Sequence, residues 1–200
     1  MDDSPADRAA HEELRYIRRT LEAAGHLSTI PGRGMVGIGV LALAATAANL
    51  YGTGAPWSTA QPERALLVWA ALLAASMCVG VWAMARKAQR SGQIFWSPVL
   101  RRALWGYGAA MLLGGILTAS ALLAGRLDRL PEIWLGCYGA ALCSAGVVSV
   151  SPVRWMGACF LILAGAAVLT PPQNGLLLLG LGFGWLHIAF GAYIAWRHNG

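Results

Sequence analysis

The side chains of this chain that could do chemistry are few, and they lie inside long apolar runs. His187 lies near the middle of the last of these runs. In hydrocarbon an imidazole needs a hydrogen-bond partner or a water-filled surrounding, so a histidine at this depth marks either a helix–helix contact or a functional site. Counting along the apolar runs places Ser76 and Ser144 at a similar depth. His187, Ser76 and Ser144 therefore form the candidate intramembrane polar site.

Two interpretations of this site are open at the level of sequence. In the first, His187 forms a hydrogen bond with Ser76 or Ser144 and so ties two helices together. In the second, the three side chains line a cavity for a ligand or a proton. Haem ligation would require a second axial histidine from another subunit, because only His187 lies deep in an apolar run.

Catalysis is not expected from the residue types at depth. The apolar runs contain no Asp, Glu, Lys or Arg, whereas proton-coupled carriers usually use an ionisable relay within the bilayer and hydrolases need an acid, a base and a nucleophile in register. The cysteines form no C-x-x-C pair and are expected to act as small hydrophobic residues. We therefore expect no catalytic residue, no cofactor and no metal site. The four cysteines are Cys78, Cys137, Cys143 and Cys159.

The elements that must position these residues are predicted by the distribution of charge. Hydrophobic residues make up 57% of the 200 residues and charged residues only 12%, and the charges lie between the apolar runs. A helix needs about 20 mostly apolar residues to cross the bilayer core. We predict an all-α polytopic membrane protein with a cytoplasmic amphipathic helical arm over residues 1–30. A bundle of six transmembrane helices follows over residues 31–200, with spans at about 35–51, 65–85, 103–124, 133–150, 155–169 and 175–196.

The distribution of cations predicts the orientation of these helices. Basic residues gather in the arm and in the segment from Arg86 to Arg102, and cytoplasmic loops carry an excess of Lys and Arg. With both termini in the cytoplasm, only Arg64, Arg126 and Arg129 of the fifteen cations lie outside. This bias explains the net charge of +6, so we expect the lipid bilayer as the surrounding partner and no nucleic acid.

The N-terminal arm carries a narrow apolar stripe, which we call the N-terminal seam. Ser4-Pro5-Ala6-Asp7 is typical of a helix start, and Gly25 of a helix end. The stripe suits packing against another helix better than lying on lipid, which favours a broader face with Trp or Phe. Three interpretations are open: a solvated helix resting on its own cytoplasmic loops, a contact with a second copy or a cytoplasmic partner, or a lipid contact. The seam consists of Ala10, Leu14, Ile17, Leu21 and Ala24.

Small residues at helical spacing predict where helices pack closely. Gly180, Gly184 and Gly191 share one face of the last helix with His187, and Gly106, Ala110 and Gly114 share one face of the third span. Such faces allow a neighbouring backbone to approach. Pro31, Pro98 and Pro152 each precede an arginine at the start of an odd-numbered span. This recurring pattern indicates one of two things. Either the chain contains three repeated helical hairpins, or proline favours helix starts and arginine the cytoplasmic membrane boundary independently at each site.

The layout resembles a class of small bacterial six-span membrane proteins. The matching features are the short cytoplasmic helix, the Thr29-Ile30-Pro31-Gly32-x-Gly34 segment before the first span, and the tail from His187-x-x-x-Gly191 to Arg197-x-x-Gly200. The resemblance covers most of the chain. It implies a location in the bacterial inner membrane and assigns no activity, ligand or catalytic residue.

Three functional hypotheses follow from these patterns. The leading one is a non-enzymatic membrane protein whose seam binds a cytoplasmic partner or a second copy, in sensing or regulation. The second is a small transporter or channel with a polar layer around His187, and it requires a cavity that reaches this histidine. The third is an intramembrane enzyme, for which tight binding of a metal or cofactor would be the indication.

Overall fold

The computed structural model describes residues 13, 14, 16, 17, 30–53, 62–90 and 96–197. In these residues the regular structure is helical, with no strand. Two short elements, η1 and η2, are 3-10 turns, whereas η3 is π-helical. Segments α7, η3 and α8 follow one another without a break and are called the last helix. The elements are α2 (Gly32–Thr53), α3 (Pro62–Arg90), α4 (Pro98–Leu123), η1 (Leu127–Arg129), α5 (Leu130–Gly146), α6 (Ser151–Leu169), η2 (Pro172–Asn174), α7 (Gly175–Leu179), η3 (Gly180–Leu186) and α8 (His187–Arg197).

The predicted all-α fold class is confirmed, and the lengths of the helices fit a multi-pass membrane protein. Five helices are long and apolar enough to cross a membrane, namely α2, α3, α4, α6 and the last helix. The predicted span 133–150 corresponds to α5, which has 17 residues and is shorter than these five. Helices α2, α3, α4, α5 and α6 begin three to five residues before the predicted spans, because their first turns contain residues such as proline and arginine that belong at a membrane boundary, whereas the last helix begins at Gly175 as predicted.

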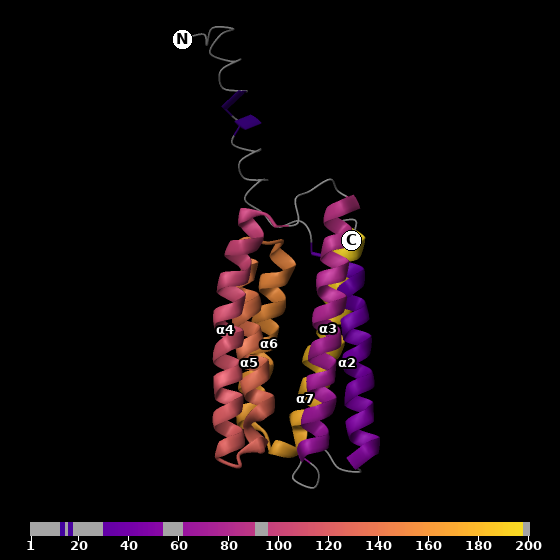
Figure 1. The fold of residues 1–200 in the computed structure, drawn as a ribbon, viewed down its shortest axis with the longest axis vertical. Coiled ribbons are helices and arrows are strands. Elements are labelled where there is room, and N and C mark those ends of the chain that lie inside the picture. The colour runs from indigo at the N-terminus through magenta and orange to yellow at the C-terminus, as the bar shows by residue number, and fades with distance from the viewer. Residues whose placement is uncertain (1–12, 15, 18–29, 54–61, 91–95, 198–200) are drawn as a thin grey trace.

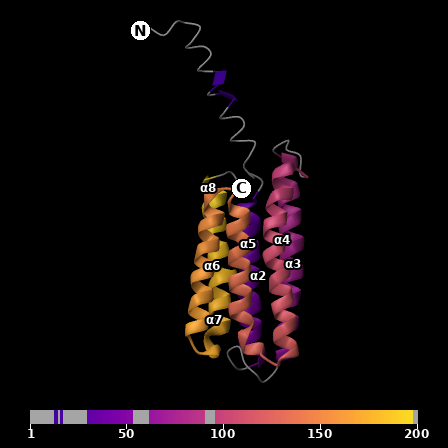
Figure 2. The same ribbon diagram turned by 90° about the vertical axis from the view of Figure 1, so that its left-hand side faces the viewer.

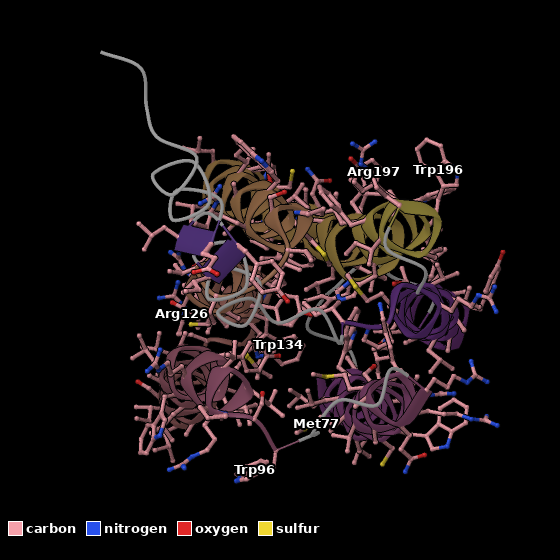
Figure 3. All side chains as sticks on the ribbon, turned by 90° about the horizontal axis from the view of Figure 1, so that it is seen from above. Met77, Trp96, Arg126, Trp134, Trp196 and Arg197 are labelled. Carbon is pink, nitrogen blue, oxygen red and sulfur yellow. The ribbon has the colours of Figure 1, made fainter. Side chains whose placement is uncertain are left out.

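Each long helix runs antiparallel to the one before it, and α4, α5 and α6 lie on one side of the view with α2, α3 and the last helix on the other (Figure 1). The starts of α2, α4 and α6 and the end of α8 lie at one end of the bundle, which we call the Arg90 end, and η1 and η2 lie at the opposite end (Figures 1 and 2). Seen along the bundle, the order is α4, α5, α6, last helix, α2, α3 (Figure 3). Helix α3 packs extensively on α2 alone among the described helices.

Local sequence explains where helices start and stop. The Ser97 hydroxyl accepts a hydrogen bond from the Leu100 N–H at 3.1 Å, and Pro98 occupies the first turn of α4. The first N–H groups of a helix have no partner within it. The Ser97 hydroxyl satisfies one of them, and Pro98 has no N–H to satisfy. At the other end of α4, Gly125 has a φ of +66°. Glycine adopts this left-handed conformation without strain, so the chain turns there into η1.

Glycines set the closest contacts between helices. A Cβ added to Gly191 would lie 2.8 Å from the carbonyl oxygen of Gly32 and 2.9 Å from the backbone nitrogen of Val36. A Cβ added to Gly157 on α6 would lie 2.8 Å from the carbonyl oxygen of Gly139 on α5. No real Cβ fits at such distances, so the two helices in each pair can approach this closely only because Gly191 and Gly157 have no side chain. Helices α2 and α8, and helices α5 and α6, are therefore in close backbone contact.

A small cluster at the Arg90 end joins α3 to α4. Leu100 and Ala103 of α4 are buried against Met84 of α3 and Ile30, the residue two places before α2. The ammonium group of Lys87 donates a hydrogen bond of 2.9 Å to the carbonyl oxygen of Ile30. Because that bond links α3 to the chain before α2, the basic segment predicted from sequence also has a packing role.

The predicted N-terminal helix is described at four residues only. Glu13, Leu14, Tyr16 and Ile17 are helical and exposed, with 64% of Leu14 and 51% of Ile17 accessible. Ala10, Leu21 and Ala24 of the seam lie outside the described residues. The two seam residues that the structure does describe are thus not covered by the bundle.

Candidate intramembrane site

The candidate site is centred on His187, which begins α8 at the middle of the last helix. Only 2% of this residue is exposed. An imidazole so deeply buried in an apolar bundle needs partners for both ring nitrogens. A polar group without a hydrogen-bond partner in hydrocarbon costs roughly several kcal/mol of free energy.

Both ring nitrogens of His187 have partners. Nε2 lies 2.7 Å from the hydroxyl of Tyr138 on α5, and Nδ1 lies 3.4 Å from the carbonyl oxygen of Gly182. A carbonyl only accepts, so Nδ1 carries the proton and Nε2 accepts the hydrogen bond from Tyr138. Both ring nitrogens of His187 are thus satisfied, and the bond with Tyr138 links the last helix to α5.

The hydrogen bond expected with Ser76 or Ser144 is replaced by the bond with Tyr138. Ser144 is exposed on α5 and lies where a Cβ on Gly106 of α4 would meet it at 3.1 Å. Ser76 is half-buried on α3, which does not pack extensively on the last helix. These side chains do not meet, because Ser144 faces α4 from α5 and Ser76 lies on α3, which packs extensively only on α2 among the described helices. The polar layer of His187, Ser76 and Ser144 is thus not assembled in this structure.

The π-helical segment η3 shapes the site. A π-helix places one extra residue in each turn and is often found at functional sites. Here the wider turn sets the Gly182 carbonyl oxygen beside the imidazole of His187. A Cβ on Gly182 would lie 2.7 Å from a Leu135 methyl group and 2.9 Å from the Phe160 ring. The absence of a side chain at Gly182 therefore lets η3 approach α5 and α6 closely.

Aromatic rings surround the imidazole. The ring centroids of Phe183, Phe160 and Tyr138 lie 6.1, 5.8 and 5.5 Å from that of His187, and Phe183 is stacked on it at 18°. Tyr138 also contacts Phe160 at 4.8 Å and Tyr107 of α4 at 6.2 Å. Rings at such distances attract one another through their quadrupoles and exclude water. The histidine is enclosed by an aromatic cluster contributed by α4, α5, α6 and η3.

A second group of aromatic rings connects α3 to the cluster. Trp69 lies 6.0 Å from Trp134 and 6.0 Å from Phe183, and Trp134 points toward the middle of the bundle (Figure 3). The indole N–H of Trp134 donates to the Thr118 hydroxyl at 3.0 Å, which in turn donates to the Gly114 carbonyl oxygen at 2.7 Å. These contacts tie α3, α4 and α5 together at the level of the cluster.

The predicted packing faces lie against identifiable neighbours. Gly180 and Gly184 face Thr46 and Leu43 of α2. Gly106 and Gly114 lie against α5, at Ser144 and Cys137, and Ala110 is half-buried on the same face. Gly191 lies seven positions after Gly184, and both face α2, whereas His187 between them contacts α5 and α6. The glycine face and the histidine therefore contact different helices.

The site contains no group of metal ligands in the part of the chain that the structure describes. The four cysteines are unpaired, and Cys143 Sγ lies 3.8 Å from the Arg154 carbonyl oxygen. The His187–Tyr138 pair could in principle pass a proton, but the donor and the acceptor are both engaged and the ring is enclosed. What the geometry does is to fix the last helix against α5.

Comparisons with protein-family models, with curated proteins and with solved structures found no match to this chain.

Proposed function

We propose that this chain is a non-enzymatic, multi-pass protein of the bacterial inner membrane whose N-terminal helix binds a protein partner or a second copy, in a sensory or regulatory role. The observation that carries the proposal is the exposure of Leu14 and Ile17. They lie three residues apart, on one side of a helix, and water is an unfavourable surrounding for both. A protein contact would cover them.

The proposal includes six membrane spans, with α5 as the fourth. At 1.5 Å per residue α5 is about 26 Å long, and η1 continues it at one end. That length approaches the ~30 Å of the hydrocarbon core. Helix α5 also lies along α4 and α6, which are its most extensive neighbours. A helix packed side by side with two spans is best explained as a span itself.

An even number of spans would leave both termini on one side of the membrane. We assign that side to the cytoplasm, because Arg90, Arg101, Arg154 and Arg197 all belong to helix ends at the Arg90 end of the bundle. The opposite end carries Arg126 and Arg129, whose charges are balanced by Asp128 and Glu132 at 3.0–3.6 Å. An excess of cations at one end is the signature of the cytoplasmic side.

The enclosed histidine supports a scaffold role in preference to a transport path. A transporter or channel built on His187 would need water or solute to reach the imidazole, and this ring is covered by Phe160, Phe183 and Tyr138. The pair His187–Tyr138 instead joins the last helix to α5. A membrane domain held together in this way, with Leu14 and Ile17 exposed, is suited to holding a partner at the membrane surface.

The test is removal of residues 1–25 from the full-length protein. We expect proteins that copurify with the wild type to be lost, while the amount of membrane-inserted protein and its thermal unfolding stay the same. A matched control keeps the arm but replaces Tyr16, which is exposed outside the seam, with Ser. The same partners and the same assembly size in the truncated protein would refute the proposed role of the seam.

A further inference from the structure

We propose that α3 carries a binding site for an anionic phospholipid in the membrane leaflet at the Arg90 end. Two guanidinium groups hold the lipid phosphate, and an acyl chain lies along the helix beside them. The inference goes beyond the proposed function, because it uses neither the N-terminal seam nor a protein partner. The site, which we call the arginine stripe, consists of Ala75, Cys78, Trp82, Arg86 and Arg90.

The first observation is that the arginine stripe lies on an exposed side of α3. Its residues follow one another at spacings of three or four positions, which places them one above another on a helix. All five are exposed, and 60% of Trp82 is accessible. Helix α3 lies at a corner of the bundle (Figure 3) and packs extensively on α2 alone among the described helices. The stripe therefore faces the surrounding membrane.

The second observation is the arrangement of the two arginines. The Cζ atom of Arg86 lies 5.0 Å from the centroid of the Trp82 ring, a cation–π distance. Stacking uses the flat face of the guanidinium group and leaves the N–H groups at its edge for an acceptor. Neither Arg86 nor Arg90 forms an ion pair with another described residue, whereas Arg126 and Arg129 at the opposite end are paired with carboxylates.

The charge at the Arg90 end indicates the chemistry of the ligand. Beyond the N-terminal arm, the acidic residues of the described helices are Glu63, Asp128 and Glu132, and all three belong to the opposite end of the bundle. The counter-charge of the stripe must therefore come from another molecule. Guanidinium groups bind phosphate through parallel N–H bonds, and basic clusters beside membrane helices bind anionic headgroups.

The depth of the stripe indicates that the phosphate belongs to a lipid. One leaflet contributes half of the ~30 Å hydrocarbon core, which corresponds to about ten helical residues at 1.5 Å each. Counted from Arg86, one leaflet extends to about residue 76, so Trp82 and Cys78 lie at the level of the acyl chains. The small side chains of Cys78 and Ala75 allow an acyl chain to lie close to the helix. A free phosphate ion would leave this apolar part of the stripe without a ligand.

Charge also argues against a second copy of this chain as the occupant. Two arginine stripes facing each other would bring four guanidinium groups together, and like charges at an interface are unfavourable. No described residue of the bundle supplies a carboxylate at this end to separate them. An anionic phospholipid supplies both the opposite charge and the apolar chain.

The test measures which lipid lies beside the stripe in reconstituted membranes. The four native cysteines are replaced by alanine, and Val81→Cys, at a position 54% exposed beside the stripe, carries a fluorescent dansyl group. Phosphatidylcholine vesicles contain an equal small fraction of either phosphatidylglycerol or phosphatidylcholine with a nitroxide quencher on the acyl chain. We expect phosphatidylglycerol to be preferred beside the dansyl group by about fivefold or more.

Two double variants separate the stripe from the general basic charge of this end. Arg86→Gln with Arg90→Gln should abolish the preference, with unchanged quenching by phosphatidylcholine showing that α3 is inserted as before. Arg154→Gln with Arg197→Gln removes the same charge from exposed side chains on α6 and α8 and should keep the preference. Inorganic phosphate added at constant ionic strength should also leave it unchanged.

The opposite results would overturn the inference. Equal quenching by the two lipids in the wild type, or a preference that survives the loss of Arg86 and Arg90, excludes a site on the stripe. An equal loss in the Arg154 and Arg197 variant would mean that net charge alone attracts the lipid. Competition by inorganic phosphate would indicate a free ion as the ligand, and weak quenching by both lipids would indicate that protein covers α3.

Discussion

The last helix and α3 are both long apolar helices, yet they differ in how much of their surface is buried within the bundle. In an apolar stretch of 18 residues along the last helix, half of the residues are buried within the protein, compared with 11% in a stretch of the same length in α3. The last helix contacts α2, α5 and α6, whereas α3 packs extensively on α2 alone among the described helices. Side chains more than half exposed on α3 include Leu67, Leu73, Met77, Val81 and Trp82.

The difference shows what directs burial when the solvent is lipid. Hydrophobicity cannot separate the two helices, since acyl chains solvate a leucine as well as the protein does. The last helix carries glycines at 175, 180, 182, 184 and 191 and a polar pair through His187, whereas α3 carries only Gly80. Close backbone approach and a hydrogen bond between helices select the central position, and a helix without them stays at the edge.

The largest effect is expected from the same substitution made in the two helices. Gly191→Ala places a Cβ 2.8–2.9 Å from atoms of Gly32, Met35 and Val36 on α2. The helices must separate, at a cost of about 1–3 kcal/mol of unfolding free energy. Gly80→Ala on α3 meets only an Ile38 methyl group at 3.9 Å. It should be neutral or slightly stabilising, because alanine favours a helix.

Unfolding of the two variants in mixed micelles measures this contrast. Equal destabilisation by Gly191→Ala and Gly80→Ala would mean that the glycine contacts do not distinguish the last helix from α3. The comparison would then need another explanation.

The next effect concerns the His187–Tyr138 hydrogen bond. Tyr138→Phe removes the donor to Nε2 and should lower the unfolding free energy by roughly 0.6–2 kcal/mol. In a double-mutant cycle with His187→Phe, the two changes should be coupled by about 0.6–1.7 kcal/mol, since they remove one shared bond.

Ser76→Ala is the matched change on α3. It should alter the unfolding free energy by less than about 0.5 kcal/mol, because Ser76 does not meet the histidine. Additive effects of Tyr138→Phe and His187→Phe, or a strong coupling of His187 to Ser76, would contradict the geometry of the site.

The smallest effect lies outside both helices, in the turn that precedes α5. The hydrogen bond from Arg126 lowers the pKa of the Asp128 carboxyl from its usual 3.8. A carboxyl whose pKa is lower in the folded protein than in the unfolded chain stabilises the fold at any pH above the unfolded-state pKa. This stabilisation is lost as the pH falls through the folded-state pKa. Asp128→Asn should therefore slightly lower the melting temperature at pH 7, and this loss should shrink as the pH falls below 3.8. A loss that persists unchanged in acid would argue against this pair.

The sequence predicts where the helices begin and end better than it predicts which helices pack against one another. Segregated charges delimit α2, α3, α4, α6 and the last helix, and Pro98 and Pro152 mark helix starts, because these signals are local. The four-residue spacing of Gly180 and Gly184 indicates a packing face. That this face meets α2 depends on the order of helices around the bundle, which no local pattern encodes.

The partner of His187 was missed for a physical reason. A residue count along an apolar run gives the depth of the backbone, which is close to the depth of the hydroxyl for a short side chain such as serine. The hydroxyl of Tyr138 lies at the far end of a ring, well away from its own Cα, so the depth of its backbone does not give the depth of its polar atom. A tyrosine in the middle of an apolar helix was the available signal, since a buried phenol usually has a hydrogen-bond partner. The π-helical turn of η3 carries no comparable signal apart from its three glycines.

The central claim is that apolar helices cross the bilayer six times, with α5 as one of them, and it can be tested by cysteine labelling. In a variant whose four native cysteines are replaced by alanine, single cysteines are introduced at Asp128 and at Ser151, which lie on either side of α5. We predict that a membrane-impermeant maleimide labels Asp128→Cys in intact spheroplasts and labels Ser151→Cys only after the membrane is opened. Labelling of both positions from the same side would contradict the account.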